Sequence, residues 1–400
     1  MEWSYEVHNC INYKHLFISG CEEKVYKDNG NEHIIELKED IEVYSDIYLK
    51  DVITKKEEDD FVEIISENYK IDTTKLGKKD YEVIYKIDDK KYSHKFIINI
   101  VDTESPRVFS GTNKTVTIGY EKDLCDLITY GDNYDGDISC KIEGKYNLDK
   151  KGTYKLKYYL TDDSKNTKEV NITLNVKEKN NSGSSSSTPK KRTEFSDVIK
   201  KYKTNKTEIG IDVSKWQGNI DFEKVKKAGA TFVMMRIGVQ KTAKGELEID
   251  PYYLENIQKA KAANLKVGVY LYSIATSTEE AIKHANWVIK VLDGEKLDLP
   301  IVFDWENWSK WNSYKISFYE INNIANNFMI TVKNNGYEGM LYSSKFYLES
   351  IWTNQLNFPV WLAHYTEKTS YKGKYKMWQL CNNGKIDGIN GDVDINVLYN

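Results

Sequence analysis

The sequence predicts a multidomain fold in which two small all-β sandwiches precede an irregular α/β barrel. Three observations support this fold class. The N-terminal half repeats a pattern of alternating strands, a Ser/Gly run divides the chain near residue 180, and the C-terminal half alternates apolar strands with helical stretches. A chain of 400 residues is long enough for two or three domains of ordinary size.

A hairpin pattern occurs twice in the N-terminal half. Residues 77–101 and 152–176 each begin with glycine and continue with an alternating strand, a polar turn around Asp-Asp, and a second alternating strand. This repeat predicts two modules, at about 32–101 and 102–177. Short strands between turn signals predict a small β-sandwich for each module. Residues 1–31 show no pattern that we can assign.

The second module resembles the bacterial Ig-like domains of cell-surface proteins. The resemblance rests on DNYDGDIS at 132–139 and on KKGTYKLKYYLTDDSKNT at 150–167. The first module is similar to a more diverged copy. The DGD of residues 135–137 offers carboxylates that could hold a cation, but a plain polar turn is the commoner use of such residues, and we expect no metal.

The stretch KEKNNSGSSSSTPKKRTEFSD begins at residue 177 and predicts a linker. Serine and glycine leave the backbone free, and the proline and basic residues that follow are also typical of linkers. We therefore assign residues 178–204 to a flexible linker between the second module and the barrel.

Composition and charge exclude several classes of protein. The net charge of −4 argues against a nucleic-acid partner. No run of 18 or more apolar residues is present, which predicts no transmembrane segment. Residues 1–30 lack the apolar stretch of a signal peptide, so the chain is either cytosolic or begins after a leader that has been removed. We expect a monomer.

The five cysteines are Cys10, Cys21, Cys125, Cys140 and Cys381. Their spacings match no zinc-binding pattern. Two small disulfide loops, one from the first pair and one from the second, and free buried thiols are equally good interpretations of the first four. Cys381 is the odd one and is expected in the core.

The C-terminal half has the pattern of a barrel that begins near residue 205. Candidate strands lie at 208–214, 231–238, 266–274, 300–306, 339–344, 359–365, 376–381 and 392–399. Candidate helices lie between the first six strands, at 221–230, 250–265, 277–292, 314–337 and, shorter, 345–352. Alternating strands and helices predict a parallel sheet, and eight strands fit a (β/α) barrel whose last three units lack full helices.

Four carboxylates lie on predicted barrel strands. Asp212 lies near the end of the first strand, Asp304 and Glu306 end the fourth, and Asp394 lies on the last. Since catalytic groups of such barrels gather at the C-terminal ends of the strands, we expect the four to converge. Asp304 and Glu306 are two residues apart, so they face the same side, about 6.5 Å apart along the strand, and Trp305 faces the other.

Aromatic residues near predicted strand ends would suit a sugar ligand. They are Trp216, Tyr270, Tyr272, Trp308, Trp361, Tyr365 and Trp378. Paired acids at such a site are typical of glycoside hydrolysis, in which one carboxyl protonates the leaving oxygen. A Mg²⁺ or Ca²⁺ site and purely structural acids are the alternatives that this pattern leaves open.

Residues 205–400 resemble the glycoside hydrolase family 25 muramidases. The resemblance rests on motifs in the family's order: IGIDVSKWQGNIDFEKVKKAGATFVMMRIG, DPYYLENIQKAKAANLKVGVYLYS, DWE, PVWLAHY, MWQ and DVDIN. It implies a (β/α)5β3 TIM-like barrel that cleaves the β-1,4 bond between N-acetylmuramic acid and N-acetylglucosamine of peptidoglycan. It implies neither a metal nor a cofactor, and it places the protein outside the cell or at the cell wall.

The resemblance also implies roles for individual residues. Glu306 matches the general acid, and Asp304 matches the acid that orients or stabilises the substrate's acetamido group. Asp212 and Asp394 match the flanking carboxylates, and Gln379 of the MWQ motif joins the substrate-binding residues. Neighbouring-group participation and direct attack by water both remain open.

Two alternatives to a wall-anchored muramidase follow from the sequence. A non-catalytic glycan-binding or adhesion protein would need aromatic and polar groups but no poised carboxylates. A phage-type lysin would fit the missing leader. His364 stands where the family often has Arg or another polar residue, and both a changed substrate contact and a structural histidine fit that position.

Overall fold

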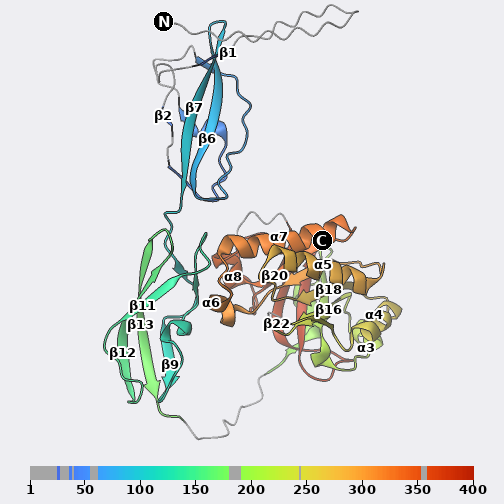
Figure 1. Ribbon diagram of the computed structural model, residues 1–400. Coiled ribbons are helices and arrows are strands. Elements are labelled where there is room, and N and C mark those ends of the chain that lie inside the picture. The colour runs from blue at the N-terminus through green and yellow to red at the C-terminus, as the bar shows by residue number, and fades with distance from the viewer. Residues whose placement is uncertain are drawn as a thin grey trace, which may run out of the picture. The chain divides into compact units, whose positions relative to one another are not determined.

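The computed structural model describes residues 25–27, 36–37, 40–54, 62–179, 191–242, 245–352 and 358–400. It divides into two compact units, residues 1–103 and 104–400 (Figure 1). Cys10, Cys21, the Ser/Gly run and most of residues 1–31 lie outside the described residues, so the interpretations made for them stay predictions.

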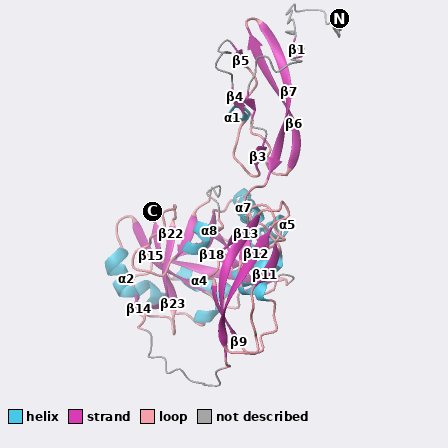
Figure 2. Ribbon diagram, turned by 90° about the vertical axis from the view of Figure 1, so that its left-hand side faces the viewer, coloured by secondary structure: helices cyan, strands magenta, loops and turns pink. Residues whose placement is uncertain are grey.

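The first unit is a sheet built on one long hairpin. Strands β6 (Gly77–Ile87) and β7 (Lys90–Val101) pair antiparallel along their whole length, as predicted for 77–101 (Figure 2). The remaining elements are β1 (Val25–Lys27), β2 (Glu36–Leu37), β3 (Asp40–Glu42), α1 (Leu49–Val52), β4 (Ile53–Thr54) and β5 (Val62–Ile64). Strands β1 and β3 run parallel to β7, and β5 pairs with β6.

The second unit begins with a β module, residues 104–177, that contains the second predicted hairpin. Strands β12 (Gly152–Thr161) and β13 (Thr167–Lys177) pair antiparallel, with β11 (Ser139–Glu143) beside β12 and β9 (Asn113–Thr117) parallel to β13. A two-stranded sheet joins β8 (Arg107–Val108) to β10 (Tyr130–Gly131), and the helical turn η1 spans Leu124–Leu127. The repeat is confirmed at the level of the hairpins, whereas Ig-like sandwiches for the two modules stay a prediction.

The β module is closed by a disulfide. Cys125 in η1 is bonded to Cys140 in β11, which is one of the two loops that the cysteine spacing left open. Tyr158 is fully buried and donates a hydrogen bond from its hydroxyl to the carbonyl oxygen of Leu124, 2.9 Å away. The disulfide and this hydrogen bond hold the helical turn against the sheet.

Eight strands close a barrel in the C-terminal part. They are β15 (Thr207–Val213), β16 (Phe232–Gln240), β18 (Lys266–Tyr272), β19 (Ile301–Asp304), β20 (Gly339–Ser344), β21 (Val360–Ala363), β22 (Met377–Lys385) and β23 (Val393–Tyr399). Neighbouring strands from β15 to β22 run parallel in the order of the chain, and β23 lies antiparallel between β22 and β15. The pairing of β23 with both neighbours closes the sheet.

Helices follow the first five barrel strands, as predicted. They are α3 (Phe222–Lys227), α4 (Tyr253–Ala262), α5 (Thr278–Leu292), α6 (Trp311–Tyr314) with α7 (Phe318–Asn334), and α8 (Lys345–Ser350). The short strand β17 (Leu247–Ile249) pairs with β16, and two 3-10 turns, η2 (Lys215–Gln217) and η3 (Trp308–Lys310), follow β15 and β19. Strands β21, β22 and β23 follow one another without helices.

Part of the predicted linker packs onto the barrel. Within 178–204, the structure places β14 (Thr193–Glu194) beside β22 and α2 (Phe195–Tyr202) on the barrel, with Phe195 and Val198 buried. Apolar residues at positions 195, 198 and 199 give this helix one apolar face, which explains why it packs.

Side chains of the barrel strands alternate between two cores. The inner core contains residues such as Met234, Val302 and Met340, while the outer core lies between the strands and the helices. Cys381 is buried and unbonded, which confirms its expected place in the core. Among the described residues, no helix is both long and apolar enough to cross a membrane.

Candidate active site

Strand β19 delivers two acids to one cavity, as the sequence predicted. Its four residues, 301–304, are buried, and Asp304 ends it on the inner side of the barrel. Trp305 points outward, is fully buried in the outer core, and donates from Nε1 to the carbonyl oxygen of Ala275 at 3.0 Å. Glu306 lies beyond the end of the strand and lines the same cavity as Asp304.

The antiparallel strand β23 explains how Asp394 reaches this cavity. Asp394 lies near the start of β23 and is paired in register with Asp212 near the end of β15. Because β23 runs against the other strands, its beginning lies at the edge where they end. All four predicted carboxylates therefore line one cavity of about 440 Å³ at the C-terminal ends of the parallel strands.

Asp212 is held by two side-chain amides. Its Oδ2 accepts hydrogen bonds from Asn396 Nδ2 at 2.7 Å and from Gln379 Nε2 at 2.9 Å. Tyr342 and Tyr365 in turn donate to Oε1 of Gln379, at 2.8 and 3.0 Å, so the orientation of this amide is fixed from both sides. These hydrogen bonds hold the carboxylate of Asp212 in place, and both of the groups that donate to it are uncharged amides.

Burial raises the pKa of all four acids, and the charges of neighbouring acids raise it further for Asp304, Glu306 and Asp394. Burial raises the pKa of Asp212 to about 6, against the opposing effect of its two amide donors. Burial, and then the charge of Asp212, raise the pKa of Glu306 to about 7 and that of Asp394 to about 9. Asp304 is the most enclosed of the four, and burial followed by the charges of Glu306 and Asp212 raises its pKa well above its usual range.

These surroundings make the four acids chemically different from one another. Solvent reaches the Glu306 side chain at the mouth of the cavity, although the walls of the site remove enough water to shift its pKa. Asp212 has the lowest pKa of the four and is therefore charged at neutral pH, whereas Asp304 and Asp394 are protonated. Two carboxyl groups whose pKa values are pushed apart are the arrangement that acid–base chemistry uses.

Most of the predicted substrate-binding residues line the cavity. Trp216, Tyr270, Tyr272, Trp361, Tyr365 and Gln379 are all part of its wall. Trp216 is 76% exposed and lies under the Lys215 ammonium, whose Nζ is 4.7 Å from the ring centroid. A large flat ring that is left exposed at the rim of a polar cavity offers a stacking surface for a sugar.

Trp308 and Trp378 do not line the cavity, contrary to our expectation. The chain turns into η3 after Glu306, so Trp308 is buried against Tyr347, with ring centroids 4.0 Å apart. Trp378 precedes Gln379 on β22, and alternation therefore points it to the outer core, where it donates to the carbonyl oxygen of His364. Both tryptophans are structural.

His364 is also held by neighbouring residues and does not line the cavity. Its Nδ1 lies 2.9 Å from the hydroxyl of Thr369, and its backbone N–H donates to Gln379. These bonds match the structural interpretation of this histidine.

Six residues of the site were not predicted from the sequence: Ser214, Gln217, Arg236, Tyr342 and Asn382 line the cavity, and Asn396 binds Asp212. Arg236 lines the cavity and is paired with the buried Asp250. A single charged residue in an otherwise apolar strand is a sequence signal from which Arg236 could have been predicted. Tyr342 lies on an inward position of β20. Asn396 lies two residues beyond Asp394 and on the same face of β23. Only the pairing of β23 with β15 brings its amide to Asp212.

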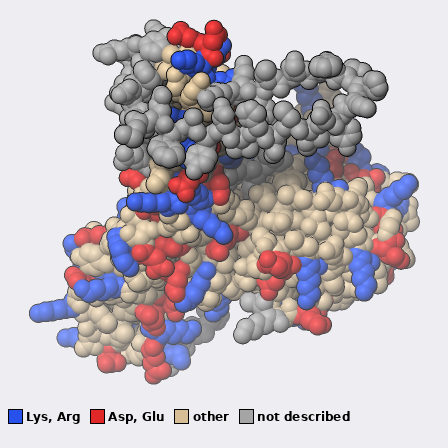
Figure 3. Space-filling view, turned by 45° about the horizontal axis from the view of Figure 1, so that its top comes forward, with Lys and Arg blue, Asp and Glu red and all other residues tan. Residues whose placement is uncertain are grey.

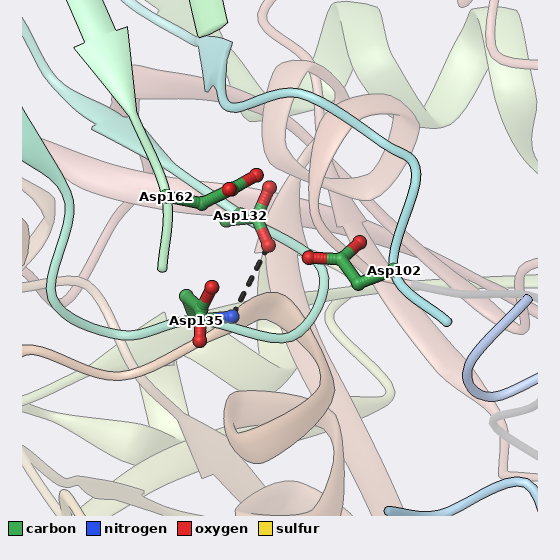
Figure 4. Close-up of side chains that lie close together, drawn as sticks. All are labelled: Asp102, Asp132, Asp135 and Asp162. Carbon is green, nitrogen blue, oxygen red and sulfur yellow. Dashed lines mark hydrogen bonds between the residues drawn. The ribbon is translucent and has the colours of Figure 1, made fainter. Parts of the chain in front are cut away.

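A second acidic group lies in the β module. One carboxylate oxygen from each of Asp132, Asp135 and Asp162 lies within 4.8 Å of the other two (Figure 4). Backbone N–H groups donate to all three: Asp132 accepts from Tyr134 and Asp135, Asp135 from Asp163, and Asp162 from Asn166. Burial raises the pKa of Asp132 to about 6. These bonds are sufficient for a polar turn.

The barrel is similar in sequence to proteins of a known family. Residues 211–389 match the model of the family described as glycosyl hydrolases family 25. These residues form a family 25 domain. The chain is 28% identical over 192 residues to the uncharacterized protein YegX of Escherichia coli K12, covering 47% of this chain and 68% of YegX. It is 27% identical over 188 residues to an autolytic lysozyme of Clostridium acetobutylicum, covering 46% of this chain and 54% of that protein.

Solved structures are also similar to the chain. The modular autolysin LytC of Streptococcus pneumoniae, solved in complex with a synthetic peptidoglycan ligand, is 26% identical, with a TM-score of 0.44. The match covers 61% of this chain and 56% of LytC. The family 25 domain begins on β15 and includes Asp212, Asp304 and Glu306, whereas Asp394 and Asn396 lie just beyond the matched residues.

Proposed function

We propose that this protein is a peptidoglycan muramidase that hydrolyses the β-1,4 bond between N-acetylmuramic acid and N-acetylglucosamine. The observation that carries this function is the convergence of four carboxylates with separated pKa values in one cavity of the family 25 domain. A protein that only binds glycan gains nothing from carboxyl groups that repel one another. The enzyme needs one acid that holds a proton near neutral pH, and Glu306 meets that need.

Glu306 acts as the general acid. Its carboxyl is protonated below about pH 7 and is open to the cavity, so it can donate its proton to the glycosidic oxygen as the bond breaks. Asp212 ionises at lower pH and supplies the negative charge that stabilises the positive charge developing at the anomeric carbon.

Asp304 binds the acetamido group of the substrate. Its side chain is 4% exposed, and Oδ1 has no hydrogen-bond partner among the described residues. Because its pKa is raised well above its usual range, Asp304 is protonated and can donate to the acetamido oxygen. Asp394, with a pKa of about 9, is a second neutral acid at the other side of Asp212.

The direct test is digestion of purified peptidoglycan followed by mass spectrometry of the soluble fragments. The wild type is expected to create new reducing ends on N-acetylmuramic acid. Glu306→Gln is expected to lower the rate by about 10²–10⁴-fold, the usual contribution of a general acid. Glu349→Gln, at an exposed ion pair with Lys345, is the matched control and should leave the rate unchanged.

Other results of this digestion would contradict the proposal. New ends on N-acetylglucosamine would keep a hydrolase but reject the bond. Wall binding by the wild type without cleavage would favour the glycan-binding alternative.

We infer further that the enzyme works at the bacterial cell wall, where its substrate lies. The two N-terminal modules are then candidates for spacers or wall-binding units. Fractionation of expressing cells, followed by detection of the chain in the wall fraction, tests this location.

A further inference from the structure

We propose that the β module, residues 104–177, is a positioning element of the active site. It holds the segment 308–319, which packs behind Trp305, the residue between Asp304 and Glu306. This inference rests on the proposed muramidase function. It concerns contacts within the second compact unit, which contains both the module and the barrel.

The module contributes a side chain to the barrel core. Phe109 follows β8, is 6% exposed, and belongs to the outer core of the barrel and not to the core of its own module. Its ring meets Trp311 and Phe318 edge-on, with centroids 5.5 and 5.7 Å apart. The guanidinium group of Arg107 lies over the ring of Phe318, with Cζ 4.6 Å from the ring centroid.

Backbone hydrogen bonds fix the same segment. The carbonyl oxygens of Asp132 and Asn133 accept from the N–H groups of Phe318 and Tyr319, at 2.8 and 3.4 Å. These N–H groups belong to the first turn of α7, which has no partners for them within the helix. The turn that the sequence singled out as DNYDGDIS therefore caps a helix of the barrel.

Asn312 of α6 and Lys315, which follows the helix, complete the interface. Asn312 donates from Nδ2 to the carbonyl oxygen of Ile128 at 2.8 Å and accepts from the N–H of Tyr130 at 3.3 Å. Lys315 is paired with Asp137 at 2.7 Å on the surface, a contact that adds little stability. The interface thus has an apolar centre and a polar edge, as stable interfaces do.

The interface leads to the catalytic acids through a short series of aromatic rings. Trp311 lies 5.8 Å from Trp305 and 5.7 Å from Trp308, and Trp305 lies 4.6 Å from Trp308, all between ring centroids. Trp305 is the residue between Asp304 and Glu306. A shift of this ring cluster moves the backbone on which both acids stand, and a displacement of about 1 Å can lower a rate about 10²-fold.

Two glycines show how closely the surfaces approach. A Cβ at Gly136 would lie 2.0 Å from the carbonyl oxygen of Lys315, and one at Gly131 would lie 2.9 Å from both Phe318 and Trp311. Neither glycine has a positive φ, so the absence of a side chain, and not an unusual backbone, is what the interface requires.

Gly136→Ala in the full chain is the test, with Gly111→Ala as the matched control. A Cβ at Gly111 meets nothing within 4 Å, and that residue also has no positive φ. We expect Gly136→Ala to lower kcat/KM on peptidoglycan by about 10- to 100-fold while Gly111→Ala keeps the wild-type value. Asn312→Ala, which removes hydrogen bonds without adding atoms, should act in the same direction.

The pH dependence separates a positioning role from simple loss of folded protein. Loss of folded protein lowers the amount of active enzyme but leaves the pKa of Glu306 unchanged in the chains that remain folded, whereas a loosened Trp305 admits water to Glu306 and moves the alkaline limb of the profile to lower pH. The rates are measured on chains whose thermal unfolding shows that they are folded at the assay temperature.

The outcomes distinguish this inference from the proposed function. An inactive wild type would reject the muramidase itself. If the wild type is active and both Gly136→Ala and Asn312→Ala keep its rate and its pH profile, the module has no positioning role. The muramidase function would then still stand.

Discussion

At the scale of single residues, the site works through differences between like groups. Asp212, Asp304, Glu306 and Asp394 are all carboxylic acids, yet their surroundings place their pKa values in different ranges. Two amide donors favour the charged form of Asp212, while enclosure and the charge of Asp212 favour the neutral forms of the others. The division of labour among the acids therefore comes from neighbours, not from side-chain type.

This division predicts a bell-shaped pH profile for kcat/KM. Carboxyl groups are neutral below their pKa and charged above it. Activity should fall as pH rises through about 7, where Glu306 loses its proton, and as pH drops through about 6, where Asp212 gains one. Initial rates between pH 4 and pH 9 should thus peak in the narrow range between these two values. A rate that still rises above pH 8 would mean that Glu306 is not the acid.

At the scale of elements, the order of strands and helices places the chemistry. Strand β19 is apolar up to Asp304, so it is buried in the barrel wall and delivers its acids only where it ends. Strand β23 runs the opposite way and brings Asp394 to the same edge. Helix α7 begins within the segment 308–319 that packs behind Trp305, and its start is fixed by a capping box of Ser317 and Glu320.

Ser317→Ala should lower the free energy of unfolding by about 1 kcal/mol, the usual cost of a lost N-cap. The Ser317 hydroxyl accepts from the N–H of Glu320 at 3.1 Å, and the Glu320 carboxylate accepts from the N–H of Ser317 at 2.7 Å. Urea unfolding of the full chain measures the change. Ser313→Ala, at an exposed serine of α6, is the control and should cost less. Equal stability of the two variants would show that the cap contributes nothing.

At the scale of the whole molecule, the described surface carries both signs of charge. On the face shown in Figure 3, Lys and Arg alternate with Asp and Glu, and neither sign covers a continuous area. This agrees with the small net charge of −4. On this face, therefore, no area of a single sign would attract a charged polymer over a long range.

The second unit is expected to unfold in one transition, because Phe109 of the β module belongs to the barrel core. All tryptophans of this unit lie in the barrel, so their fluorescence reports barrel unfolding. The disulfide lies in the module and closes a loop with a sequence separation of 15. Changing Cys125 and Cys140 to alanine should remove about 3 kcal/mol from the module and shift the tryptophan transition to lower denaturant. An unchanged tryptophan transition would mean that the barrel folds without the module.

The sequence by itself determined the strand–helix alternation, the two hairpins, the four acids and the outward direction of Trp305. These features depend on local periodicity, and burial preserves local periodicity when the chain folds. Only the tertiary structure decided which aromatic residues line the cavity, since alternation gives two faces of a strand but not the turn that follows it, as Trp308 shows. It also decided the amide partners of Asp212 and the packing of Phe109 into the barrel. Those contacts join residues between 167 and 209 positions apart, and no local pattern records which distant segments will meet.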